Sequence, residues 1–69
     1  MERIVVDARG RSCPEPVILT KNALEQKAAG YEILVDNRTA LGNVSRFLTH
    51  AGKTVKVEEQ GEDFRILAE

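Results

Sequence analysis

The chain has 69 residues, of which 42% are hydrophobic and 30% are charged, a composition typical of a single globular domain spanning residues 1–69. Ten Lys and Arg against eleven Asp and Glu give a net charge of −1, which argues against a broad basic surface for binding nucleic acid or membranes. The single cysteine excludes an intrachain disulfide and a zinc site built from several cysteines.

The composition also predicts a location. No apolar run approaches the ~18 residues of a membrane span. Glu2, Arg3 and Asp7 interrupt the early apolar segment, so we expect no signal peptide. A free thiol without a secretion signal favours the cytoplasm.

The first half of the chain predicts a strand, a loop and a helix. Residues 3–7 are β-branched and bounded by polar residues, which is typical of a strand. Residues 8–13 form a loop, and residues 14–29 carry an apolar stripe at helical spacing, made of Val17, Thr20, Leu24 and Ala28, with Ile18 off it. Gly30 stands where a left-handed residue could end this helix.

A second strand and helix follow. Residues 31–36 alternate, which places Tyr31, Ile33 and Val35 on one face of a strand. Thr39 is a candidate N-cap for a helix that ends at Gly52. Its apolar stripe has the clearest periodicity in the chain, with Leu41, Val44, Leu48 and Ala51 at intervals of three and four.

Two more strands complete the pattern, at residues 53–59 and 63–68, with a turn at Gly61. Val55 and Val57 are expected to point inward. The two strand–helix–strand units imply parallel pairing and place both helices on one face of the sheet. We therefore predict an α+β fold, a two-layer α/β sandwich of order βαβαββ with a four-stranded mixed sheet and an open, mostly polar second face. Loops at the carboxyl ends of its parallel strands are the expected place for a site.

The most informative segment is residues 12–17, SCPEPV. Pro14 favours an extended Cys13 at the N-cap of the first helix, where the helix dipole stabilises a thiolate. Arg9 and Arg11 add to this effect, whereas Glu15 opposes it. Pro16 removes a second first-turn N–H group and stiffens the turn. The helix could also begin one or two residues later, and a lone cysteine can equally be a buried, inert hydrophobe.

Other chemistry around Cys13 finds little support in the sequence. His50 lies near the end of the second helix, far from Cys13, which argues against a Cys–His dyad. The acids and His50 do not cluster with Cys13 at metal-ligand spacing, and the chain has no resolving cysteine for a redox dithiol. A nucleophilic thiol without its own base suits a carrier that passes a group between partners.

The run VDARGRSCPEP, residues 6–16, resembles the signature of the TusA/SirA-like sulfur-carrier proteins, in which an aspartate and a glycine precede a Cys-Pro-x-Pro motif. The VDN segment, residues 35–37, most resembles the YedF-like branch. The resemblance implies a βαβαββ sandwich in which Cys13 carries sulfur as a persulfide. A cysteine desulfurase or another donor delivers the sulfur, and an acceptor protein receives it, as in tRNA thiolation or related sulfur and selenium metabolism.

Two features depart from the family pattern. Arg11 stands where many relatives have an apolar residue, usually leucine, which affects the loop before the cysteine and partner choice. YedF-like proteins often carry a further domain, so the sequence is compatible with a stand-alone carrier and with an excised domain.

The site hypothesis gives each residue of this segment a role. Cys13 is the nucleophile, Pro14 and Pro16 shape the turn, and Arg9 and Arg11 stabilise the thiolate or dock a partner. Glu15 flanks the site, Asp7 and Gly10 help the loop turn, and Arg38 is a solvated loop charge or part of the same rim. This describes a sulfurtransferase-like persulfide carrier with protein partners rather than a self-sufficient enzyme, and we expect no cofactor and no metal.

Two other classes remain as alternatives. A non-catalytic interaction or regulatory module would keep Cys13 packed and silent. Nucleic-acid binding through the sheet face is disfavoured by the charge and by three aromatic residues, Tyr31, Phe47 and Phe64, that are all expected in the core.

Overall fold

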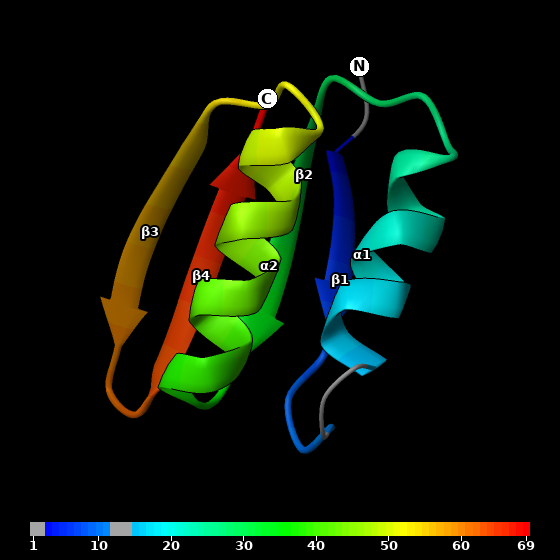
Figure 1. Ribbon diagram of the computed structural model, residues 1–69. Helices are drawn as coiled ribbons and strands as arrows, with labels where there is room; N and C mark the ends of the chain where they lie inside the picture. Colours follow the sequence, from blue (N-terminus) through cyan, green and yellow to red (C-terminus); the bar gives the residue numbers. More distant parts are fainter. Residues whose placement is uncertain (1–2, 12–14) are drawn as a thin grey trace.

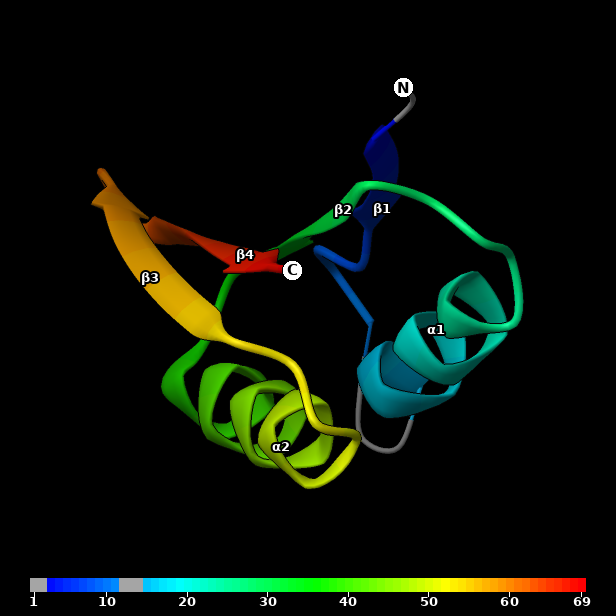
Figure 2. The ribbon, with the colours of Figure 1, turned by 90° about the horizontal axis from the view of Figure 1, so that it is seen from above.

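The computed structural model describes residues 3–11 and 15–69. Along this part of the chain the elements are β1 (Arg3–Asp7), α1 (Glu15–Leu24), β2 (Gly30–Val35), α2 (Arg38–His50), β3 (Val55–Gln60) and β4 (Asp63–Ala68). The four strands form a mixed sheet, and both helices lie on one of its faces (Figures 1 and 2). The predicted α+β two-layer sandwich is confirmed.

The strand order is β1-β2-β4-β3, so β4 lies between β2 and β3. β1 pairs with β2 in parallel, whereas β4 is antiparallel to both of its neighbours. The expectation of parallel pairing therefore holds for β1 and β2 but is wrong for β2 and β3, which run in the same direction without touching. The strand sequences explain this order, because β4 alternates buried residues and takes a central place, while β3 carries exposed charges typical of an edge strand.

The core lies between the sheet and the helices. Ile33 of β2 and Ile66 of β4 are paired in register, and both are fully buried. Val44 and Leu48 of α2 are also fully buried, at the positions that the periodicity predicts. Removing these side chains from water is the main source of stability in a chain of this size.

The first helix is shorter than predicted. α1 ends at Leu24, and Gly30 is the buried first residue of β2 rather than a helix terminator. A Cβ atom at Gly30 would lie 3.5 Å from the carbonyl oxygen of Ala68, an ordinary van der Waals distance, so neither the backbone nor the neighbouring strand requires glycine at this position. Gly52 and Gly61 do adopt positive φ values of 85° and 65°, as the predicted helix end and turn require.

Two expected core residues are more exposed than predicted. Val57 has 45% of its surface exposed, although its register partner Ile66 is fully buried. The reason is its place on the edge strand, which leaves its side chain without full cover. Phe47 of α2 is only half-buried and lies outside the main core, whereas Tyr31 and Phe64 are buried as expected.

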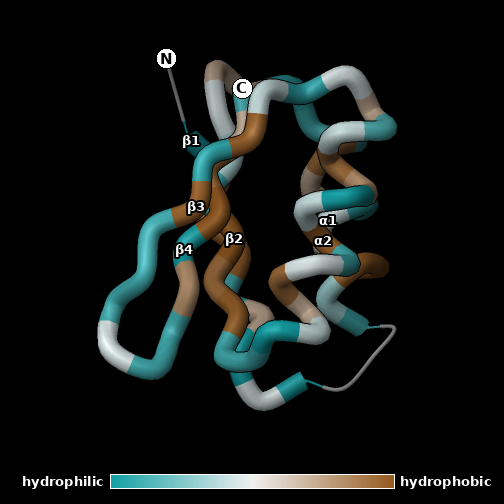
Figure 3. The backbone as a smooth tube through the Cα atoms, turned by 60° about the vertical axis from the view of Figure 1, so that its left-hand side comes forward, coloured by the Kyte–Doolittle hydropathy of each residue, from teal (hydrophilic) through white to brown (hydrophobic). Residues whose placement is uncertain are grey.

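The open face of the sheet is mostly polar, as predicted, although Val5 of β1, in register with Glu32, leaves 58% of its surface exposed there. Arg65 of β4 lies between Glu32 of β2 and Glu58 of β3, with N–O distances of 3.6 and 3.4 Å, and Arg3 also pairs with Glu32. Hydrophilic residues dominate the hairpin between β3 and β4 (Figure 3). No helix in the described part of the chain has the length and apolar character needed to cross a membrane.

Candidate functional site

Three connections meet at one end of the sheet. The segment after β1, the segment between β2 and α2, and the β3–β4 turn all lie at the lower end in Figure 1. This end holds the carboxyl termini of β1, β2 and β3, where open α/β sheets bind ligands. Cys13 belongs to the connection between β1 and α1, but Ser12, Cys13 and Pro14 lie outside the described residues. The expected extended Cys13 and the N1 position of Pro14 therefore stay predictions.

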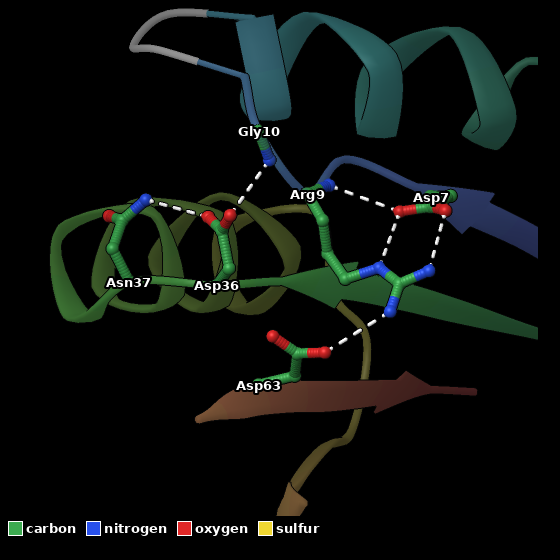
Figure 4. A network of polar contacts seen from close by, with 6 residues as sticks. All are labelled: Asp7, Arg9, Gly10, Asp36, Asn37 and Asp63. Atoms are coloured by element: carbon green, nitrogen blue, oxygen red, sulfur yellow. Dashed lines mark hydrogen bonds and ion pairs between the residues drawn. The ribbon is translucent and has the colours of Figure 1, made fainter. Parts of the chain in front are cut away.

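Arg9 is held between two carboxylates (Figure 4). Its Nε and Nη2 atoms donate to the Oδ1 and Oδ2 atoms of Asp7, each at 2.9 Å. Its Nη1 atom donates to Oδ2 of Asp63, the first residue of β4, at 3.1 Å. The hydrogen bonds from Arg9 lower the pKa of the Asp7 carboxyl from 3.8 to about 2, and the same contacts raise the pKa of Arg9. Both groups are therefore charged across the physiological range, and the loop is tied to the start of a central strand.

Gly10 is held by a side chain from the neighbouring connection. Its N–H donates to Oδ2 of Asp36 at 2.8 Å, and its φ of 75° lies in the region that favours glycine (Figure 4). One residue after β1 ends, Ala8 is buried and donates its N–H to the Leu34 carbonyl at 2.8 Å. The loop thus leaves the sheet as a continuation of the β1–β2 ladder.

Asn37 caps the second helix. Its Oδ1 atom accepts the N–H of Ala40 at 2.7 Å, and its own backbone is extended with φ of −151°. The predicted cap at Thr39 is wrong, because the helix begins at Arg38 and Thr39 already lies within its first turn. The Nδ2 atom of Asn37 donates to Oδ1 of Asp36 at 3.2 Å, so the cap also contacts the carboxylate that holds Gly10.

Two residues flank Cys13 in the sequence and meet in space. Nη1 of Arg11 lies 3.2 Å from Oε2 of Glu15, the first residue of α1, and both side chains are half exposed. Pro16 is buried in the first turn of α1, and its carbonyl accepts the hydroxyl proton of the buried Thr20 at 2.8 Å. Arg11 and Glu15, which flank residues 12–14, are thus joined by an ion pair, and the helix that follows is anchored by the buried Pro16 in its first turn.

Arg38 and His50 occupy the two ends of α2. Arg38, exposed at the start of the helix, lies over the ring of Phe64 at 5.6 Å from the guanidinium carbon to the ring centroid. His50 is the last residue of α2, at the other end of the sheet from the site (Figure 1). The sequence predicts this place near the end of the second helix, whereas the position of Cys13 lies outside the described residues.

A shallow depression on the open face is lined by Thr54, Lys56, Leu67 and Glu69, at the opposite end of the sheet from the three connections. The loop end carries the candidate nucleophile, and so we place the site there on chemical grounds. Among residues 3–11 and 15–69, no group of three or more His, Cys, Asp and Glu side chains could hold a metal ion.

The sequence hypothesis did not assign roles to Asp36 and Asp63. Asp36 directly follows β2, and Asp63 is the first residue of β4. Both lie at the end of the sheet where the parallel strands β1 and β2 finish. That placement was available as a signal, but the partner of each carboxylate depends on the three-dimensional arrangement. Arg9 and Asp63, for example, are 54 positions apart in the chain.

Comparisons with known proteins agree with this architecture. The family model described as Sulfurtransferase TusA matches residues 4–69. Two relatives carry the name "Putative sulfur carrier protein". One, from Methanocaldococcus jannaschii, is 43% identical over 65 residues, which are 90% of this chain and 87% of the relative. The other, from Halobacterium salinarum, is 40% identical over 62 residues, which are 84% of this chain and 75% of the relative.

A solved structure supports the same assignment. The crystal structure of a SirA-like protein from Desulfitobacterium hafniense superposes with a TM-score of 0.84 at 30% sequence identity. The match covers 94% of this chain and 93% of that one. The family model spans nearly the whole sequence, and the fold and the relatives agree with it. The chain belongs to the TusA sulfurtransferase family.

Proposed function

We propose that this chain is a sulfur carrier that accepts sulfur as a persulfide on Cys13 and passes it to an acceptor protein. The observation that carries the proposal is the identity of 43% to a protein named as a sulfur carrier, in a chain whose one cysteine lies in the Cys-Pro-x-Pro motif. The structure supports it by placing the neighbouring residues 8–11 and Glu15 at the carboxyl end of the parallel strands.

The proposed reaction consists of two exchanges at sulfur. The Cys13 thiolate attacks the outer sulfur of a donor persulfide, so that a new S–S bond forms on Cys13 and the donor cysteine leaves as a thiolate. A nucleophile of the acceptor then attacks the outer sulfur of the Cys13 persulfide, and Cys13 leaves as a thiolate. Each step exchanges one bond to sulfur for another, and neither needs an external oxidant or reductant.

The proton transfers belong to the partners in this scheme. His50, the one histidine in the sequence, lies at the opposite end of the sheet. Within the described part of the chain, the groups around the loop are carboxylates and guanidinium groups engaged with one another. Such groups are poor general bases for a thiol at neutral pH. We therefore propose a carrier that works with partner proteins rather than a self-sufficient enzyme.

The arginines before Cys13 have different roles in this scheme. Arg9 orders the loop, because its guanidinium is engaged by Asp7 and Asp63. Among the described residues, Arg11 forms an ion pair with Glu15, and its side chain is 53% exposed. An exposed pair of this kind is weak and can be exchanged for a carboxylate of a docking protein. Arg11 is therefore the better candidate for contact with a partner or with the thiolate.

The proposed partners are a cysteine desulfurase or another sulfur donor, and a sulfur-acceptor protein, acting in the cytoplasm. The transferred sulfur would serve tRNA thiolation or related sulfur or selenium metabolism. In this scheme the persulfide sulfur is a cargo bound covalently to Cys13, and no cofactor or metal ion takes part.

A transfer experiment tests this function. The chain is incubated with a cysteine desulfurase and cysteine that carries radioactive sulfur, separated from the enzyme, and then treated with a thiol reductant. The proposal predicts that label stays with the isolated chain, is released by the reductant, and is absent from a Cys13→Ser variant. Label on the variant, or a wild-type chain that stays unlabelled with several desulfurases and with a small-molecule persulfide, would contradict it.

Alkylation separates this proposal from the packed-cysteine alternative. An exposed thiol reacts with iodoacetamide in the native chain at a rate similar to that of the chain in denaturant. A thiol protected by packing reacts only after unfolding. The carrier proposal predicts the first result, and protection in the native state would favour a non-catalytic interaction or regulatory module.

A further inference from the structure

We infer that Asp36 is a positioning residue for sulfur transfer, because its carboxylate fixes the backbone of the loop that leads to Cys13. This inference rests on the proposed function. The observation behind it is the hydrogen bond from the Gly10 N–H to Oδ2 of Asp36, at 2.8 Å, between two connections that are 26 positions apart (Figure 4).

The contact replaces a missing rung of the parallel sheet. In a parallel pair, successive hydrogen bonds from one strand come from every second residue. Ala8 donates to the carbonyl of Leu34, and so the next rung would join Gly10 to the main-chain carbonyl of Asp36. The Asp36 side chain accepts this N–H instead, at the point where Gly10 turns to a φ of 75° and the chain after Asp36 turns into α2.

The same carboxylate is connected to the start of α2. Its Oδ1 atom accepts from Nδ2 of Asn37 at 3.2 Å, and Asn37 caps the helix through Ala40 at 2.7 Å. Asp36 therefore joins the loop before Cys13 to a helix that is anchored in the core by Val44 and Leu48. The start of α2 thus helps to fix the backbone direction at Gly10, which precedes the candidate nucleophile Cys13 by three residues.

This arrangement matters for transfer between proteins. A donor protein presents its persulfide within its own site, so the carrier thiol must reach a defined position relative to the docked surfaces. A small reagent imposes no such restriction, because it approaches an exposed thiol from many directions. Loss of the Asp36 contact should therefore slow transfer from a protein donor more than it slows reaction with a small molecule.

The test compares Asp36→Ala with Asp36→Asn. Alanine removes the acceptor, whereas asparagine keeps one oxygen for the Gly10 N–H. We measure the rate of sulfur uptake from a desulfurase persulfide, the rate of alkylation by iodoacetamide and its pH profile. For Asp36→Ala we expect about a tenfold loss in the first rate, since a small misplacement of reacting groups can reduce a rate by that factor or more. We expect the alkylation rate and its pH profile to stay near those of wild type.

Asp36→Asn should recover most of the transfer rate. Glu62→Ala serves as the matched control, since Glu62 is an exposed acid in the β3–β4 turn at the same end of the sheet. NMR gives a readout independent of sulfur transfer, because loss of the hydrogen bond in Asp36→Ala should shift the Gly10 amide proton upfield and speed its exchange with solvent.

The possible results separate the inference from the function. Equal transfer rates for Asp36→Ala and an active wild type would overturn the inference and leave the proposed function intact. An equal slowing of transfer and alkylation would also overturn it, because the thiol itself would then be affected. A matching loss in Asp36→Asn and Glu62→Ala would attribute the effect to charge and exclude the hydrogen bond. Failure of wild type to take up sulfur would instead contradict the proposed function.

Discussion

The guanidinium of Arg9 and the carboxylate of Asp63 lie 3.1 Å apart, although 54 positions separate them in the chain. Arg9 belongs to the connection that contains Cys13, and Asp63 begins a central strand of the sheet. Together with Asp7, which binds the other side of the same guanidinium, this contact fixes the start of the loop. The start of the loop is therefore held by charged hydrogen bonds to β4 in addition to the packing of the buried Ala8.

The Asp7 contact predicts a pH dependence of stability. The pKa of Asp7 is lowered from 3.8 to about 2 by hydrogen bonds from Arg9, so the folded state favours the ionised carboxyl. Its stabilising effect is complete above pH 3.8 and is lost as the pH falls through about 2. Asp7→Asn should therefore be less stable than wild type at pH 5, with a difference that disappears near pH 2.

Urea unfolding at a series of pH values measures this difference. Glu62→Gln is the control, because it removes a nearby exposed acid and should follow the wild-type curve. A constant gap between wild type and Asp7→Asn down to pH 2 would show that the ionised carboxyl is not the source of the effect.

The capping of α2 predicts a contrast between two neighbouring positions. Asn37→Ala removes the side-chain acceptor for the Ala40 N–H and should lower the free energy of unfolding by about 1 kcal/mol. Thr39→Ala, at the position that the sequence favoured, should change it by less than about 0.5 kcal/mol, as is usual for exposed sites. Chemical denaturation of both variants checks this, and a larger loss at Thr39 would contradict the assigned cap.

The core assignment predicts a second contrast. Leu48 is fully buried on α2, and Leu48→Ala should destabilise the fold by about 2–5 kcal/mol through lost burial and a residual cavity. In a domain of this size that loss is comparable to the whole stability. Ile18 is 48% exposed on α1, and Ile18→Ala should have a much smaller effect. The thermal unfolding midpoints of both variants would distinguish these positions, and similar midpoints would contradict the packing described above.

Much of the fold could be predicted from periodicity. Val44 and Leu48 lie on a helical stripe, and Tyr31, Ile33 and Val35 alternate along a strand, so local spacing reports which faces are buried. The end of α1 was harder to predict, because the stripe of Val17, Thr20 and Leu24 continues to Ala28, beyond the last helical residue. Ala28 packs against the core from the connection to β2. An apolar residue at helical spacing is therefore present there although the helix has already ended.

Other features depend on contacts that no local pattern contains. β4 lies between β2 and β3. This order depends on how deeply each strand is buried relative to the others, and no single segment of the sequence contains that information. The pairing of Arg9 with Asp63 and of Gly10 with Asp36 joins distant positions, and the sequence predicted the end of the sheet where the loops lie without showing these partners. The chemistry of Cys13 was inferred from its motif and stays a prediction for experiment.

Intact-mass measurement after sulfur loading tests the central claim most directly. The reduced chain is mixed with a cysteine desulfurase and cysteine, and its mass is recorded before and after addition of a reductant. Our account predicts a gain equal to one sulfur atom on wild type, reversed by the reductant, and no gain on Cys13→Ser. An unchanged wild-type mass in the presence of an active persulfide donor, or the same gain on Cys13→Ser, would contradict the assignment of Cys13 as the sulfur-carrying residue.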